Sequence, residues 1–189
     1  MGYGIVLPLL PNVIERLFGA VGDGSQVSRA TGMLTALYTL ALFLFAPLWG
    51  YLSDRYGRRI ILLTGLAGFG VTMLTFAFIE SLTAVYAERF LSGLFAAAVT
   101  PVALAAIGDL AATDDARARR LTFVSLAGIG GFLLGPMLGV FISRAAANIV
   151  PITWEVGALA FPLAVTAGLA LIVAVAVAVT VSGLAPDAA

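Results

Sequence analysis

Long apolar segments alternate with short polar ones along the whole chain. A helix needs about 20 apolar residues to cross a membrane, because the hydrocarbon layer is ~30 Å thick and each residue adds ~1.5 Å. Five segments meet this length, and nearly all charged residues lie outside them. We therefore predict membrane-spanning helices at 30–50, 60–79, 82–108, 121–143 and 156–183.

A sixth apolar segment, residues 1–14, is too short to cross and ends at Glu15 and Arg16. Its apolar pattern opens without a preceding polar turn, so we expect the distal part of a helix whose first turns precede Met1. Either the chain is a truncated form or its start codon has been misassigned.

Composition supports an all-α integral membrane protein. The 189 residues are 61% hydrophobic and 11% charged, with a mean hydropathy of +1.09, which is far from the composition of a soluble domain. The chain has neither cysteine nor histidine, which excludes disulfides, haem bound through histidine and the common zinc sites. We expect no cofactor. Nucleic acid is not an expected partner, because basic residues cluster only in two short loops.

The arginines predict how the helices are oriented. Short cytoplasmic loops carry an excess of positive charge. Six of the ten arginines lie in two loops, residues 55–59 after the predicted helix at 30–50 and residues 117–120 after the one at 82–108. The loops on the other side are close to balanced in charge. We therefore expect both arginine-rich loops and both ends of the intact unit to be cytoplasmic.

An internal repeat appears at an offset of 89 residues. Residues 43–50 align with residues 132–139, each with a proline four residues after the first phenylalanine, and Arg55 aligns with Arg144. Three helices separate the copies, and an odd number gives the two copies opposite orientations. Inverted three-helix repeats are typical of secondary transporters. The alternative is that Pro-x-x-Gly recurs by chance in glycine-rich membrane helices.

The charged turn at residues 50–59, GYLSDRYGRR, is the most distinctive local pattern. We expect Gly50 to allow close helix approach and Gly57 to supply the positive φ of a tight reversal. Asp54 lies among arginines at a membrane edge, where low dielectric strengthens ion pairs that can form and break as helices move. The alternative is a positive anchor at the cytoplasmic face, which needs neither the glycines nor Asp54.

This turn resembles the major facilitator superfamily, whose signature between helices 2 and 3 is G-x-x-x-D-R-x-G-R-R/K. Residues 50–59 match it completely: the fixed positions are Gly50, Asp54, Arg55, Gly57, Arg58 and Arg59. The resemblance implies the amino-terminal six-helix half of a twelve-helix transporter, similar to the drug/proton antiporter branch that includes tetracycline exporters.

In fold terms the resemblance implies one six-helix bundle over residues 1–189. Its two inverted three-helix repeats would occupy residues 1–79 and 82–183, with helix 1 truncated. In the family, the aspartate at the position of Asp54 stabilises the contact between the two halves, and the arginine at Arg58 pairs with an acid at the position of Asp109. The family partner of Asp54 lies in the second half, which this chain lacks.

Glu88 and Arg89 interrupt the predicted helix at residues 82–108. An arginine within hydrocarbon costs ~2.5 kcal/mol or more, so it faces a cavity or a partner, or it extends to the membrane surface. Both readings of Arg89 remain open from the residues alone. Arg89 and Gly93 resemble a family motif in helix 4 whose arginine is implicated in proton coupling, and Glu88 is a second candidate for that coupling.

The predicted helix at residues 121–143 carries Gly128, Gly131, Gly135 and Gly139, and their spacing predicts one shared face. Such faces allow membrane helices to pack closely, and this structural role alone is enough to explain the glycine spacing. The last three, with Pro136, also resemble the family's antiporter motif, which favours export over uptake.

The start of the chain, residues 2–11, resembles the distal half of helix 1 in this branch, where many relatives carry an acidic residue just before the glycine pair. A buried acid is a natural proton acceptor. In the chain as given, only Glu88 and Asp109 remain as proton carriers.

These patterns predict a transporter in a cell membrane, with the bacterial inner membrane favoured, that exports a small amphiphilic compound or drug by proton-coupled alternating access. Its partners would be lipid, the substrate, protons, and a carboxy-terminal half or second copy. The alternative is a non-transporting remnant or a half that pairs with or regulates another membrane chain. We expect no enzyme and no metal site, since Asp114 and Asp115 form the one paired acid and lie beside loop arginines.

Overall fold

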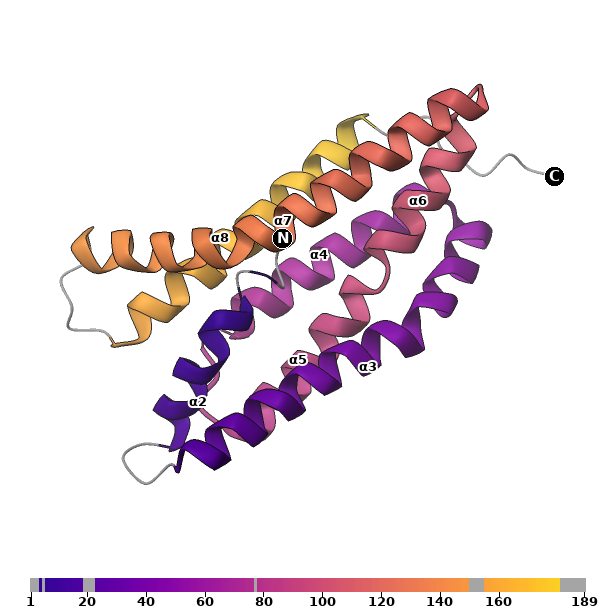
Figure 1. The fold of residues 1–189 in the computed structure, drawn as a ribbon. Helices are drawn as coiled ribbons and strands as arrows, with labels where there is room; N and C mark the ends of the chain where they lie inside the picture. The colour runs from indigo at the N-terminus through magenta and orange to yellow at the C-terminus, as the bar shows by residue number, and fades with distance from the viewer. Residues whose placement is uncertain (1–3, 5, 19–22, 77, 150–154, 181–189) are drawn as a thin grey trace.

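The computed structural model describes residues 4, 6–18, 23–76, 78–149 and 155–180. All regular structure in these ranges is helical (Figure 1). In chain order the elements are η1 Leu7–Leu9, α2 Leu10–Phe18, α3 Gly24–Tyr56, α4 Arg58–Phe76, α5 Leu82–Ala96, α6 Val99–Leu110, α7 Asp114–Ile149 and α8 Glu155–Thr180.

The described residues contain five helical segments that are long and apolar enough to cross a membrane, so the predicted all-α membrane class is confirmed. These segments are Gly24–Tyr56, Arg58–Phe76, Leu82–Leu110, Asp114–Ile142 and Pro162–Val179. Each overlaps one predicted helix. At the start of the chain, α2 continues past the end of the apolar segment 1–14 to Phe18.

The third segment consists of two helices, α5 and α6, joined by a turn at Ala97 and Ala98. Pro101 explains the interruption, because proline lacks an N–H and its ring clashes with the carbonyl four residues before it, here that of Ala97. The amide of Ala98 accordingly donates to the carbonyl of Phe95, three residues back, at 3.2 Å.

The helices form an elongated bundle in which α3 packs along α5, and α4 packs along α8 (Figure 1). The largest group of buried apolar side chains joins α2, α3, α4, α5 and α8, and it includes Ile14, Leu34, Met73, Val85 and Leu163. A second buried group lies where α4 meets α6. The turns α3/α4 and α6/α7 lie at the same end of the bundle (Figure 1).

Because α3 ends where α7 begins, these two helices run in opposite directions (Figure 1). Pro47 lies inside α3 and Pro136 inside α7, at the aligned positions of the sequence repeat. This arrangement agrees with inverted repeats at residues 1–79 and 82–183, which stay a prediction.

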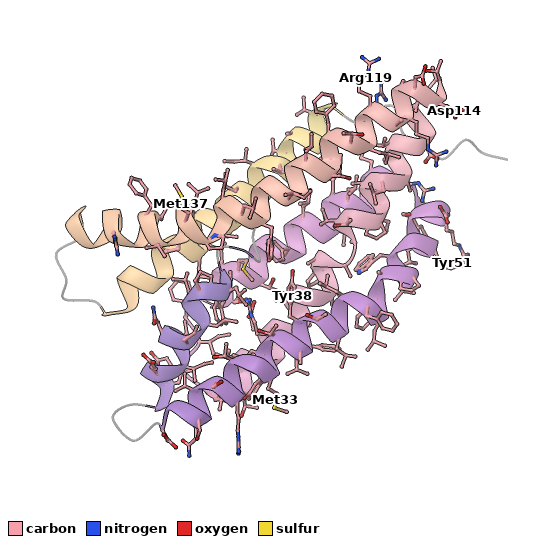
Figure 2. The ribbon with its side chains drawn as sticks, in the orientation of Figure 1. Met33, Tyr38, Tyr51, Asp114, Arg119 and Met137 are labelled. Carbon is pink, nitrogen blue, oxygen red and sulfur yellow. The ribbon has the colours of Figure 1, made fainter. Side chains whose placement is uncertain are left out.

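The outer sides of α3 and α7 are covered with exposed apolar side chains. Met33 of α3 is 60% exposed and Met137 of α7 is 69% exposed, and both point away from the bundle (Figure 2). Water does not favour such surfaces, whereas lipid does. The distribution is that of a multi-pass membrane protein.

Candidate functional site

The turn between α3 and α4 is built on one glycine. Gly57 has φ 92° and ψ 141°, and it is the one described residue in the region of positive φ, as expected from its place in the motif. Its amide donates to the carbonyl of Ser53 at 3.1 Å, which ends α3. The chain then reverses directly into α4 at Arg58, so the charged residues of the turn stay close together.

Arg58 joins three segments at this end of the bundle. Its Nε donates to Oδ2 of Asp109, at the end of α6, at 2.9 Å. Its Nη1 forms an ion pair with Oδ1 of Asp54 and donates to Oγ of Ser53 at 2.6 Å. The structure therefore joins Arg58 to Asp109, the pair that the family resemblance implies, and it places Asp54 beside the same arginine.

Ser53 is the member of this cluster that sequence reasoning missed. It is 1% exposed, and its hydroxyl donates to the carbonyl of Gly50 at 2.8 Å. Since a serine hydroxyl has one hydrogen, the oxygen faces Arg58 as an acceptor. Its sequence signal is weak, because a lone serine inside a helix is common.

Gly50 does not have the role predicted for it. A Cβ built there meets no atom within 4 Å, so close helix approach at this position is wrong. The residue contributes through its backbone carbonyl, which accepts the bond from Ser53.

The other two arginines of the turn point to different partners. Arg55 is exposed and lies 5.7 Å from the ring of Tyr56. Arg59 donates to the carbonyl of Ala178, in the last turn of α8, where a cation suits the negative end of the helix dipole. Asp54 is paired with Arg58 and not with all three arginines, and its side chain is 64% exposed.

A second charged group lies inside the bundle, on α5. The guanidinium of Arg89 donates through Nε to Oε2 of Glu88 at 2.7 Å and through Nη2 to Oε1 at 2.9 Å. The side chains are 2% and 4% exposed, respectively. Arg89 therefore pairs with Glu88 inside the bundle, which favours the interpretation that it faces a partner.

Apolar and polarisable groups from α4 surround this pair. Arg89 Cζ lies 4.3 Å from the ring centroid of Phe76, and Nη2 lies 3.9 Å from Sδ of Met73. Ser92 donates to the carbonyl of Arg89 at 3.0 Å. Water-poor surroundings strengthen the two hydrogen bonds between Arg89 and Glu88. Neutralisation of one of these residues would leave the charge of the other unbalanced.

Three of the four glycines on the predicted face of α7 are buried. Gly131, Gly135 and Gly139 are buried, whereas Gly128 is exposed, so three of the four positions of the predicted face are covered. A Cβ at Gly4 would lie 3.3 Å from the carbonyl oxygen of Gly131 and 3.4 Å from Cα of Gly135. This face therefore receives the start of the chain, and Pro136 lies within it inside the helix. Gly2 lies outside the described residues.

Among the residues that the structure describes, no group of three or more acidic side chains is arranged to hold a metal ion. Asp114 and Asp115 begin α7, where carboxylates suit the positive end of the helix dipole. The charged chemistry of the described chain therefore centres on the Arg58 cluster and the pair Glu88–Arg89.

Comparison with known proteins gives one family. The model of the Major Facilitator Superfamily matches residues 1–188. The tetracycline resistance protein of class G from Vibrio anguillarum is 35% identical over 148 residues, which cover 78% of this chain and 36% of the relative. The class B protein from Escherichia coli is 36% identical over 143 residues, 75% of this chain and 34% of the relative.

A quinolone resistance protein from Staphylococcus aureus, NorA, is 28% identical over 146 residues, which cover 77% of this chain and 36% of that protein. The chain thus spans about a third of the length of the curated relatives that it matches. Family model, motif and helical membrane fold agree, and this chain belongs to the major facilitator superfamily.

Proposed function

We propose that this chain forms the amino-terminal six-helix part of a secondary active transporter that exports a small amphiphilic compound, such as a drug, in exchange for protons. The observation that carries the proposal is the Arg58 cluster, which ties the ends of α3, α4 and α6 together at one end of the bundle. Relatives named for tetracycline and quinolone resistance support export of a drug-like compound.

In this proposal the cluster is the conformational switch of alternating access. Arg58 and Asp109 hold this half rigid, while Asp54, with its side chain 64% exposed, is able to exchange its partner for one on a second half. Ion pairs at a membrane edge suit such a role because their strength depends on how far they are removed from water. Rocking of one half against the other would make and break the contact.

Glu88 and Arg89 are the proposed site of proton coupling. A proton on Glu88 removes its charge and releases the guanidinium of Arg89, which lies 2% exposed among Phe76 and Met73. An unbalanced charge in that position is unfavourable, so protonation would favour a conformation in which Arg89 gains water or a new partner. Each cycle would thereby link one proton to one change of state.

The face of α7 that carries Gly131, Gly135, Pro136 and Gly139 supports export over uptake, as its resemblance to the antiporter motif implies. The arginine-rich turns share one end of the bundle, which supports a cytoplasmic location for both in a bacterial inner membrane. Exposed apolar sides of α3 and α7 supply surface for lipid and for a second half or a second copy.

An efflux assay tests the proposal. Cells would express the chain alone and joined to its flanking sequence, with membrane insertion checked for each. We expect loss of a fluorescent drug that an uncoupler abolishes, and Glu88→Gln should abolish the coupling. Inserted protein without uncoupler-sensitive efflux in either form would contradict the proposal and favour a chain that pairs with or regulates another membrane protein.

A further inference from the structure

The turn between α5 and α6 receives a hydrogen bond from another helix. Trp49, on α3, donates its indole Nε1–H to the carbonyl of Leu94 at 2.7 Å. In a continuous helix that carbonyl would accept from the amide four residues on, which belongs to Ala98. Here the Ala98 amide donates to Phe95 instead. The indole therefore supplies the bond that the interrupted helix gives up.

The opposite side of the turn is packed tightly against α4. A Cβ at Gly65 would lie 2.6 Å from Cβ of Ala98 and 3.1 Å from the carbonyl oxygen of Phe95. Ala97 and Ala98 are 2% and 0% exposed, respectively. Because the turn is buried, a backbone carbonyl left there without a donor would be costly.

The hydrogen bond from Trp49 to Leu94 connects two parts of the chain that carry the charged cluster. Trp49 directly precedes the charged turn at residues 50–59, while Leu94 lies between Arg89 on α5 and Asp109 on α6. The indole thus connects the end of α3 to the junction that sets the direction of α6 relative to α5. That direction decides where Asp109 lies with respect to Arg58.

We propose that Trp49 is a positioning residue: its indole N–H completes the interrupted helix at Leu94, holds the α5–α6 junction bent, and so keeps Asp109 within reach of Arg58. Pro101 creates the need for this bond, and Trp49 meets it from a neighbouring helix. The inference rests on the contacts within this chain and does not depend on the proposed transport.

A double-mutant cycle tests this dependence, using thermal unfolding of the purified 189-residue chain in detergent. Trp49→Phe keeps an aromatic ring and removes the donor, and we expect it to lower the unfolding midpoint by about 2–4 °C. In a Pro101→Ala background the helix can close on its own carbonyls, so the loss caused by Trp49→Phe should fall to less than half. Pro136→Ala, in α7, is the matched control. In that background Trp49→Phe should lower the unfolding midpoint by the full amount.

If Trp49→Phe lowers the unfolding midpoint equally with Pro101 retained and in the Pro101→Ala background, then Trp49 only fills space and the proposal is overturned. The proposal is also overturned if Trp49→Phe lowers the midpoint in neither background. If Pro101→Ala does not fold, exchange of the Trp49 indole proton with solvent tests the proposal instead. In a Trp154→Phe chain Trp49 is the sole tryptophan, and its indole proton should exchange with solvent at least tenfold more slowly than that of a free indole. Exchange at the free rate would overturn the proposal.

Discussion

Arg58 is the residue at which the candidate switch is organised. A guanidinium has five N–H donors in a fixed plane, so one arginine can address several acceptors at once. Here it reaches Asp54, Asp109 and the hydroxyl of Ser53. The buried serine fixes the plane, because its own hydrogen is committed to the carbonyl of Gly50.

This geometry makes a prediction for Ser53→Ala. The change leaves one donor of Arg58 without its acceptor, and we expect it to destabilise the chain by about 1–3 kcal/mol. In an Arg58→Met background the loss should largely disappear, since the partner is gone. Unfolding in detergent measures both, and Ser125→Ala on the exposed side of α7 is the control. Equal losses with and without Arg58 would contradict the argument.

The pair Glu88–Arg89 predicts an asymmetric response to substitution. Removal of one partner leaves a buried charge, and Glu88→Gln should cost about 3–5 kcal/mol of stability. Replacement of both, by Glu88→Gln with Arg89→Met, should restore much of that loss. Denaturant unfolding of the original chain and the two variants checks this. A double variant less stable than Glu88→Gln alone would show that Arg89 has a favourable partner other than Glu88.

Among the elements, α5 is packed closely on two sides. Its Gly93 faces α3, where a Cβ would lie 2.5 Å from the carbonyl oxygen of Tyr38 and 2.9 Å from Cβ of Ala41. Its Phe95 faces α4, where a Cβ at Gly68 would lie 2.2 Å from the phenylalanine ring. Small residues on these helices therefore set how closely α3, α4 and α5 approach one another.

Gly93→Ala tests this packing. The added methyl group would push against backbone atoms of α3, which cannot rotate away, and overpacking of this kind costs about 1–3 kcal/mol. Gly168→Ala, in α8, meets nothing within 4 Å and gains the helix preference of alanine, so it should be neutral or stabilising. Unfolding midpoints of the two variants in detergent compare them. Equal stability of the two would contradict close packing at Gly93.

Sequence patterns predicted the elements well because long apolar segments and charged turns are local signals. The reversal at Gly57 follows from one residue and its neighbours, and the structure confirms it. Contacts between helices were harder to predict. Trp49 bonds to a carbonyl 45 residues away, and the hydroxyl of Ser53 meets Arg58 only once α4 has folded back beside α3. The space around Gly50 likewise depends on helices that the local pattern does not place.

At the scale of the whole molecule, one end of the bundle concentrates the arginines. Arg58 reaches α6, Arg59 reaches the last turn of α8, and Arg120 donates to the carbonyl of Leu110 across the α6/α7 turn. These bonds tie the helix ends together at this end of the bundle. Short cytoplasmic loops carry an excess of positive charge, so we expect the same arginines to serve both packing and orientation.

The shared end makes a prediction about sidedness that needs no transport. The chain has no cysteine, so single cysteines at Tyr56 and Thr113, in the two arginine-rich turns, can be labelled without background. We expect a membrane-impermeant maleimide to leave both unlabelled in intact cells and to label both after permeabilisation. A cysteine at Glu80, in the turn between α4 and α5, should label from outside. Because Arg58 and Asp109 hold the two arginine-rich turns at one end, Tyr56 and Thr113 must behave alike, and labelling of one without the other would contradict the fold itself as well as the orientation.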